Sequence, residues 1–260
     1  MQSTILSLQS GILRLICAAA LVSTACGSGG GLFRQYEYEE ELYLSLDGTA
    51  TVYVNASVAA LDALRGASLD TRPTAPVDRE KLREMYTTSV THVARTPTLS
   101  RRGGRRFVHL RVDVADIRKL GRAAPFAWST YELNREGDLY VFRQKVGRAA
   151  GKGVGDVGWN GKEMVGFRVH VPSEIVYHNA GEGNQKRGNV IAWEQPLADR
   201  LRSEPLALDA RMKTQSILYR TLWLFAATFG TVVVAFVFVI WWILRRGPGI
   251  QSPAAGTRSL

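Results

Sequence analysis

The residues best suited to binding a charged ligand are four arginines around a glycine pair: Arg101, Arg102, Arg105 and Arg106. Two adjacent glycines favour a tight turn, so the sequence predicts a hairpin whose tip carries the four guanidinium groups. Each such cation close to an anionic membrane adds about 1 kcal/mol to binding. We therefore predict a contact with anionic lipid headgroups, with a merely solvated charged turn as the alternative.

The other reactive residue types do not form a recognisable catalytic or metal site. Four histidines lie in expected strands without the paired spacing of metal ligands: His92, His109, His170 and His178. Four glutamates could hold a divalent cation, but a solvated acidic strand explains them better: Glu37, Glu39, Glu40 and Glu41. The glycine-rich stretch 147–161 lacks the Walker spacing and is expected to be a flexible surface loop. No serine lies in a nucleophile elbow, so we expect no enzyme activity, no cofactor and no metal.

One cysteine, Cys26, has a position that suggests chemical modification. Residues 1–25 have the pattern of a signal peptide, with an apolar stretch that ends in small residues. A cysteine directly after such a stretch is typical of a bacterial lipobox, in which the thiol is acylated and starts the mature chain. Ser23 stands where leucine is usual in that motif. Lipidation of Cys26 is therefore the prediction and ordinary cleavage after Ala25 the alternative, with residues 26–33 as a glycine-rich linker.

A membrane anchor is expected near the C-terminus. Residues 222–244 are an unbroken apolar run closed by Arg245 and Arg246, and a helix of this length reaches roughly 34 Å, enough to cross a bilayer core. We predict a transmembrane helix with its flanks over 214–246. Basic residues are balanced on its two sides, so the signal peptide decides the orientation: the N-terminal part is exported, and the tail 247–260 is cytoplasmic and disordered.

The charge of the exported part indicates which classes of partner to expect. The net charge is +10 and the pI is near 9.9, and most of the basic residues precede the apolar run. Nucleic acid is an unexpected partner for an exported domain, whereas the lipid bilayer, anionic lipids or glycolipids, and envelope proteins are expected ones. Residues 34–213 have the size of one extracytoplasmic domain.

Hydrophobic periodicity predicts how this domain folds. Residues 41–46 and 51–56 alternate between apolar and polar, which indicates two strands with one buried face each. Asp47 and Gly48 mark the turn between them, and a three-residue loop that pairs Leu42 with Val52 puts both apolar sets on one side.

Further along the chain, helices are predicted at 58–65 and 78–86, with Asp78 as N-cap, and a short one at 114–120. Further strands are predicted at 90–99, 106–114, 127–134, 139–146, 164–171, 173–178 and 188–193. The fold class is therefore α+β, with a mainly antiparallel sheet, a few short helices and one C-terminal transmembrane helix.

The stretch 171–212 resembles the closing part of the LppM-like extracytoplasmic lipoprotein domains of bacteria. The similarity rests on a strand that ends near His178, a glycine-rich turn, the run from Gly188 to Trp193 and a later apolar strand. The layout of signal peptide, Cys26 and C-terminal anchor is also similar. This resemblance implies an α/β domain that binds lipids or glycolipids of the envelope, and it implies no catalytic residues.

These observations predict a single-pass protein of the bacterial cell membrane whose extracytoplasmic domain binds lipid or lipid-linked glycan without catalysis. A protein-docking or envelope-assembly module is the first alternative, and it would show an exposed apolar patch on the sheet. An unrecognised hydrolase is the second alternative. It would need a pocket that converges on His170 or His178 with a carboxylate partner.

Overall fold

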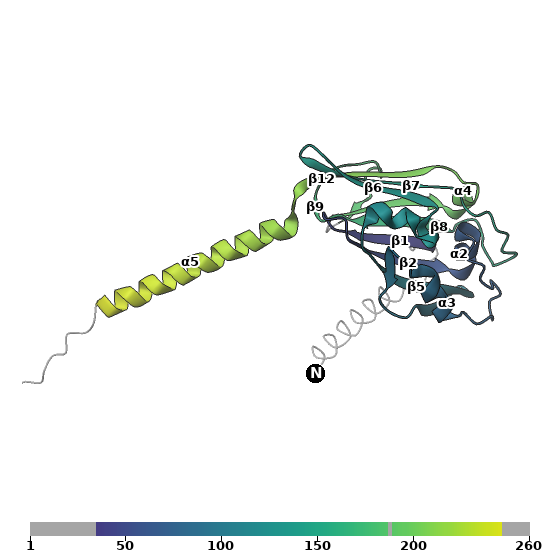
Figure 1. The fold of residues 1–260 in the computed structure, drawn as a ribbon, viewed down its shortest axis with the longest axis horizontal. Coiled ribbons are helices and arrows are strands. Elements are labelled where there is room, and N and C mark those ends of the chain that lie inside the picture. Colours follow the sequence, from purple (N-terminus) through teal and green to yellow (C-terminus); the bar gives the residue numbers. More distant parts are fainter. Residues whose placement is uncertain (1–34, 187–188, 246–260) are drawn as a thin grey trace, which may run out of the picture.

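The computed structural model describes residues 35–186 and 189–245. Two β-sheets pack face to face around one core, and a single long helix extends from the last strand (Figure 1). The class is α+β, as predicted. The predicted signal peptide, Cys26, the glycine-rich linker and the tail predicted to be cytoplasmic lie outside the described residues.

The larger sheet has eight strands in the order β10-β11-β8-β1-β2-β5-β3, and β4 also pairs with β5. Its strands are β1 (Tyr36–Leu44), β2 (Ala50–Ser57), β3 (Thr91–Val93), β4 (Thr98–Arg102), β5 (Arg105–Val114), β8 (Met164–His170), β10 (Gln185–Lys186) and β11 (Val190–Pro196). The β1 and β8 strands are parallel, and the other pairs of this sheet are antiparallel.

The smaller sheet is antiparallel and has the order β6-β7-β12-β9. Its strands are β6 (Ser129–Glu136), β7 (Leu139–Val146), β9 (Ser173–His178) and β12 (Leu206–Ser216). The β12 strand continues to Ser216, three residues past the predicted end of the domain. The strand therefore leads directly into the long helix.

Short helices join the strands: α2 (Val58–Arg65), α3 (Arg79–Tyr86), α4 (Leu197–Leu201) and the 3₁₀ helices η1 (Ile117–Arg122) and η2 (Ala124–Phe126). The Ser57 hydroxyl caps α2 by accepting a hydrogen bond from the amide of Ala60, and Asp78 caps α3 as predicted. These caps satisfy amide groups that a helix leaves without partners in its first turn.

The first hairpin has the predicted register. Leu42 pairs with Val52, and the amide of Ser45 bonds to the carbonyl of Thr49 to close a three-residue loop in which Gly48 has a φ of 96°. By contrast, the single strand predicted over 90–99 is wrong: it is divided into β3 and β4. Pro97 lies between the two strands, and proline has no amide hydrogen to give to a sheet.

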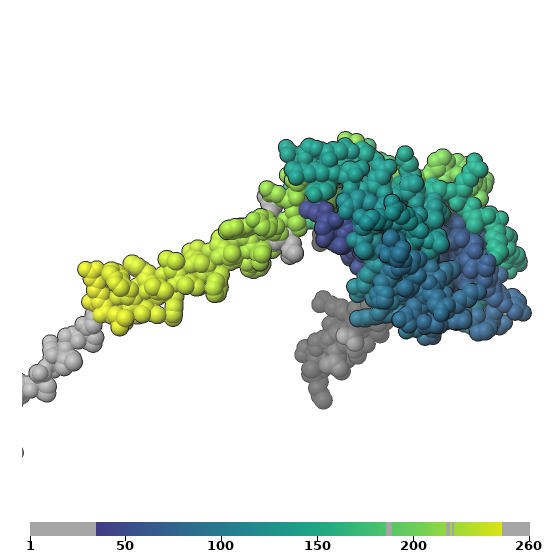
Figure 2. Space-filling view, viewed as in Figure 1, coloured from purple at the N-terminus to yellow at the C-terminus, as the bar shows by residue number. Residues whose placement is uncertain are grey.

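The long helix α5 (Ile217–Arg245) contains one candidate membrane span, Thr221–Arg245, with a mean hydropathy of 2.4. The most apolar part of this span is not buried against the domain, and Figure 2 shows the helix extending away from the body of the molecule. A soluble core helix of this composition would be covered by other elements. The uncovered apolar surface is what a lipid-facing helix requires.

The domain has two ends along its strands, and α5 leaves from one of them. Ser216 pairs with Ser173, which follows the end of β8 at His170. We call this end the base. The β5 strand starts at the tip of the β4–β5 hairpin and runs ten residues to Val114, which lies next to the first hairpin. The tip therefore lies at the end of the domain opposite the base. Ten residues of strand span roughly 33 Å.

Candidate functional site

A hollow of about 570 Å³ opens at the base of the domain, next to the start of α5. Its lining residues come from four separate segments: Asp138, Leu139, Glu174, Asn189, Lys213, Thr214 and Gln215. We call it the basal hollow. Its volume is within the range of small-molecule binding sites, which is about 300–1,000 Å³.

Strand pairing explains why these segments meet. Lys213 of β12 pairs with Leu139 at the start of β7, on one side. On the other side, β12 pairs with β9, whose second residue is Glu174. Asn189 has a φ of 58°, a conformation that asparagine tolerates, and its side-chain amide donates a hydrogen bond to the carbonyl of Ser173. This bond fixes one wall of the hollow.

The chemistry of the basal hollow is polar and mixed in charge. The Lys213 ammonium and the Glu174 carboxylate are 2.9 Å apart, and both side chains are about half exposed. Water screens such a pair, so it contributes little to stability and both groups remain accessible. Carboxylates, side-chain amides, a hydroxyl and one ammonium together offer both donors and acceptors. This mixture suits a hydroxyl-rich ligand better than a purely anionic one.

The four arginines of the predicted headgroup contact do share one hairpin tip, but they do not all point outward. Arg101 and Arg102 are exposed, and Arg102 donates a hydrogen bond to the carbonyl of Tyr36. Arg106 is only 7% exposed, and its guanidinium donates to the carbonyls of Asp70 and Ala75. Burial lowers the pKa of Arg106. Two guanidinium groups of the tip, not four, therefore remain largely open to a ligand.

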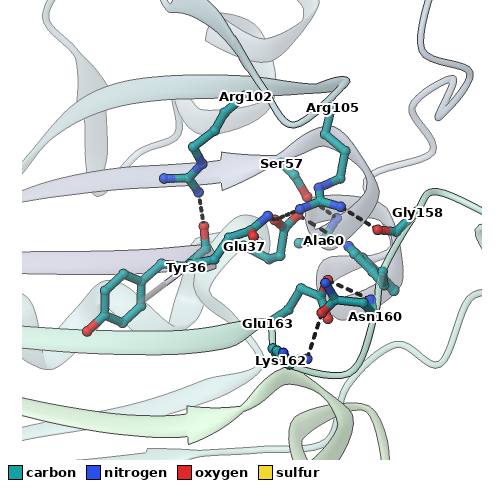
Figure 3. A network of polar contacts seen from close by, with 12 residues as sticks. Tyr36, Glu37, Ser57, Ala60, Arg102, Arg105, Gly158, Asn160, Lys162 and Glu163 are labelled. Carbon is teal, nitrogen blue, oxygen red and sulfur yellow. Dashed lines mark hydrogen bonds and ion pairs between the residues drawn. The ribbon is translucent and has the colours of Figure 1, made fainter. Parts of the chain in front are cut away.

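Arg105 joins the tip to the rest of the domain. Its guanidinium lies 3.1 Å from the buried carboxylate of Glu37 and donates to the carbonyl of Gly158 at 2.7 Å (Figure 3). The other carboxylate oxygen of Glu37 accepts a hydrogen bond from the Trp159 indole. The prediction of a flexible loop over 147–161 is therefore wrong in part: the segment has no regular secondary structure, but these bonds hold it against the sheet.

The prediction of a solvated acidic strand is also wrong. Glu37 and Glu40 are 0% and 2% exposed, and the half-buried Glu39 forms an ion pair with Arg168. The Glu41 carboxylate lies 2.5 Å from the imidazole of His170. All four carboxylates thus have partners, which is the usual condition for burying a charge.

Glu40 belongs to a buried polar network that sequence reasoning missed. Its carboxylate accepts hydrogen bonds from Arg65 at 3.0 Å, Tyr131 at 3.0 Å and Gln144 at 3.1 Å, and so links β1 and α2 to the second sheet. The Arg65 guanidinium stacks 3.7 Å from the centre of the Trp128 ring. Burial raises the pKa of Tyr131, so this phenol stays a neutral donor. The sequence did contain a sign of this burial, because Glu40 is two residues before Leu42 and therefore points to the same, buried face of the strand.

Three of the four histidines, His109, His170 and His178, contact other side chains or the backbone, and His92 is exposed on β3. His170 stacks on Tyr43, with ring centres 3.9 Å apart, and the ring of His178 accepts a hydrogen bond from the amide of Ala180. His109 bonds to Asn55 and Ser100. Within 35–186 and 189–245, no group of three or more histidine, cysteine, aspartate or glutamate residues could hold a metal ion.

Comparisons with known proteins give a weak structural similarity. No protein-family model and no curated protein matches the sequence. The chain is similar to the folded domain of LppM from Mycobacterium tuberculosis, solved by NMR, with a TM-score of 0.40 and 14% sequence identity. The match covers 74% of this chain and 98% of that domain. A similarity of this size assigns no family, no ligand and no site to this chain.

Proposed function

We propose that this protein is a single-pass protein of the bacterial cell envelope whose extracytoplasmic domain binds the headgroup of a lipid, or of a lipid-linked glycan, in the basal hollow. The observation that carries the proposal is the position of this hollow directly beside the start of α5. Binding of this kind needs complementary polar groups and no reacting residue. The family resemblance in 171–212 favours the same class of ligand.

The expected height of the hollow above the membrane favours an extended headgroup. From Thr221, where the candidate span begins, the chain passes back through one turn of α5 and then along β12 to Gln215 and Lys213. At about 1.5 Å per helical residue and 3.3 Å per strand residue, this distance is roughly 13–19 Å. The interfacial layer of a bilayer is about 5–8 Å deep on each side. A lone phosphate ends within that layer, whereas a sugar-bearing headgroup reaches the hollow.

The polar lining supports the same ligand class. Lys213 supplies a cation for a phosphate, while Asp138 and Glu174 supply acceptors for hydroxyl groups. Asn189 and Gln215 can both donate and accept. A site for phosphate alone would have more cations than carboxylates, and here two carboxylates accompany one ammonium. We therefore propose a phosphorylated or neutral glycolipid in preference to a simple anionic lipid.

A change that fills the hollow tests this function. Thr214→Trp places a large ring among the lining residues, and Thr130→Trp places the same ring on the outside of β6, where residue 130 is exposed. Full-length protein is extracted in mild detergent, and the lipids that co-purify are identified by mass spectrometry. We expect glycolipid with the wild type and Thr130→Trp, and a loss of at least tenfold with Thr214→Trp. Equal lipid in all three proteins, or none with the wild type, would overturn the proposal.

A docking function is a second candidate, supported by the edge strand β9. Val176 and Tyr177 of this strand are 52% and 47% exposed, which is unusual among the large apolar residues of the domain. An edge strand with exposed apolar side chains is a common site for protein association. Val176→Lys should weaken recovery of an envelope protein by cross-linking in cells and leave the co-purified lipid unchanged.

A further inference from the structure

Three polar side chains on the outer face of the larger sheet form a hydrogen-bonded chain. The Oγ of Ser100 lies 2.7 Å from Nε2 of His109, and Nδ1 of the same ring lies 2.9 Å from Oδ1 of Asn55. These residues come from β4, β5 and β2. Ser100 and His109 lie on the two arms of one hairpin, whereas Asn55 is far from both in the sequence, so no local motif indicates the group of three.

The sheet register places the three groups on one face. Asn55 and His109 are directly opposite each other in the β2–β5 pair. Thr98 is opposite His109 in the β4–β5 pair, and Ser100 is two residues further along β4. Residues two apart on a strand point to the same side. The arrangement therefore follows from strand pairing, and two separate pairings fix it.

The hydrogen bonds orient His109 as a base. The Asn55 carbonyl oxygen can only accept, so Nδ1 carries the proton and the lone pair of Nε2 faces the Ser100 hydroxyl. Burial, and then the charge of Arg102, lower the pKa of His109. The ring is therefore neutral at pH 7 and can accept a proton. A nucleophile, a base and a group that orients the base are the three parts of a catalytic triad.

Three arginines lie around His109, and one of them, Arg111, also pairs with the Asp113 carboxylate at 3.4 Å. Arg102 lies on the neighbouring β4, Arg111 lies two residues further along β5, and Arg95 lies in the connection between β3 and β4. Arg95 and Arg111 line a hollow of about 200 Å³ together with His109. None of the described residues that line this hollow is a carboxylate. The surroundings thus favour the neutral imidazole and attract an anionic substrate.

A second hollow borders Ser100 and the edge strand β4. Its volume is about 360 Å³, and its apolar lining comes from Ala75, Pro76, Val77 and Leu99. The β4 strand pairs with β5 alone, so alternate amide groups of β4 point away from β5 along this edge. Such amides can stabilise an oxyanion beside Ser100. An acyl chain that crosses the β4 edge reaches this hollow, whose lining also includes Arg101 and Arg106, and an anionic alcohol portion fits the hollow lined by Arg95 and Arg111.

We propose that Ser100, His109 and Asn55 form an ester-cleaving triad, a function beyond the binding proposed for the basal hollow. Ser100 Oγ attacks the ester carbonyl and its proton passes to His109 Nε2. When the tetrahedral intermediate collapses, the bond to the alcohol oxygen breaks, the alcohol leaves with that proton, and an acyl-serine remains. Water then attacks the acyl-serine, gives one proton to His109, and releases the carboxylic acid as Ser100 recovers its proton.

A fluorophosphonate probe tests the nucleophile directly. Full-length protein in mild detergent is labelled, and the modified residue is located by peptide mass spectrometry. We expect phosphonylation at Ser100, none in Ser100→Ala, and labelling about 10²-fold slower or more in His109→Gln. Ser45→Ala removes an exposed serine of the first hairpin and should label like the wild type. An unlabelled wild type, or labelling that persists in Ser100→Ala, would overturn the triad.

Asn55 is a positioning residue, so its test uses a pH profile. Labelling of the wild type should rise with pH and reach half its maximum below pH 6.5, because the imidazole must be neutral and its pKa is lowered. Asn55→Asp puts a carboxylate beside the ring, which favours the protonated form and should move this midpoint upward. If the amount of folded protein changes and the midpoint stays where it is, His109 is not the base that activates Ser100, and that outcome contradicts the triad. Co-purified lipid, measured on the same variants, reports separately on the basal hollow.

Discussion

At the scale of single residues, the buried network around Glu40 shows how the two sheets are kept in one arrangement. Glu40 accepts hydrogen bonds from side chains of both sheets and of α2. Three donors besides Arg65 satisfy the carboxylate, and the Arg65 guanidinium packs against Trp128. Burying the Glu40 carboxylate costs free energy, because the charge loses its contact with water. Removing Arg65, the cation that pairs with it, costs more, because the negative charge then stays buried without a positive one beside it.

We predict that Arg65→Met lowers the free energy of unfolding by about 3–5 kcal/mol, since it leaves the Glu40 carboxylate uncompensated. The double variant Arg65→Met, Glu40→Gln should lose less than the sum of the two single variants, because the groups are in direct contact. The measurement is denaturant unfolding of the full-length protein in detergent, followed by tryptophan fluorescence. Arg83→Met is the control: it breaks an exposed pair with Glu80, worth about 0.2–1 kcal/mol. Strict additivity would show that the pair is not coupled.

At the scale of elements, local sequence patterns were enough for the strands whose partners are close in the chain. Alternation and turn chemistry predicted the β1–β2 hairpin with its register, and the cap at Asp78 predicted α3. The parallel pairing of β1 with β8 joins residues more than a hundred positions apart, and no local pattern records such a contact. The Ser100–His109 contact lies within the β4–β5 hairpin, but the Asn55–His109 contact and the basal hollow depend on strands that are far apart in the chain, so neither the complete group nor the hollow was predictable from local spacing. The arginine tip was predictable as a turn, but the burial of Arg106 depends on a distant loop.

The segment between β7 and β8 begins at a glycine whose role is steric. A Cβ on Gly147 would lie 2.3 Å from the carbonyl oxygen of Trp128, whereas a Cβ on Gly153 meets nothing within 4 Å. Gly147→Ala should therefore destabilise the domain by about 1–3 kcal/mol, as overpacking does. Gly153→Ala should be neutral or stabilise it by up to about 1 kcal/mol. Thermal unfolding of both variants makes the comparison, and equal melting temperatures would refute the steric role of Gly147.

At the scale of the whole molecule, the uncovered apolar surface of α5 predicts one membrane crossing, and the predicted signal peptide predicts its orientation. The domain should lie outside the cell and α5 should cross the membrane, with the tail inside. Protease added to intact spheroplasts that express the protein should digest residues 34–221 and leave a small fragment that contains α5. A cytoplasmic marker protein should survive as the control. Full protection of the domain would place it on the other side of the membrane.

The two ends of the domain lead to a different prediction for the arginine tip. The tip lies roughly 30 Å along the strands from the base, where α5 begins. At this distance, Arg101 and Arg102 are better placed to contact a second membrane than the membrane that α5 spans. Proteoliposomes with the domain outward should therefore cluster with added vesicles that contain anionic lipid. They should not cluster with neutral vesicles.

This clustering should weaken with salt, because the screening length falls from about 10 Å at 0.1 M to about 3 Å at 1 M. The double variant Arg101→Gln, Arg102→Gln should remove most of it and keep the fold, since both residues are exposed and outside the core. Arg118→Gln with Lys119→Gln removes the same charge from η1, which contacts the first hairpin at the other end of β5 through the bond from Ile117 to Gly48. That control should cluster normally, because its charges do not face the second membrane. Equal loss in both double variants would show that total charge, and not the tip, attracts the vesicles. Light scattering at several salt concentrations distinguishes these outcomes.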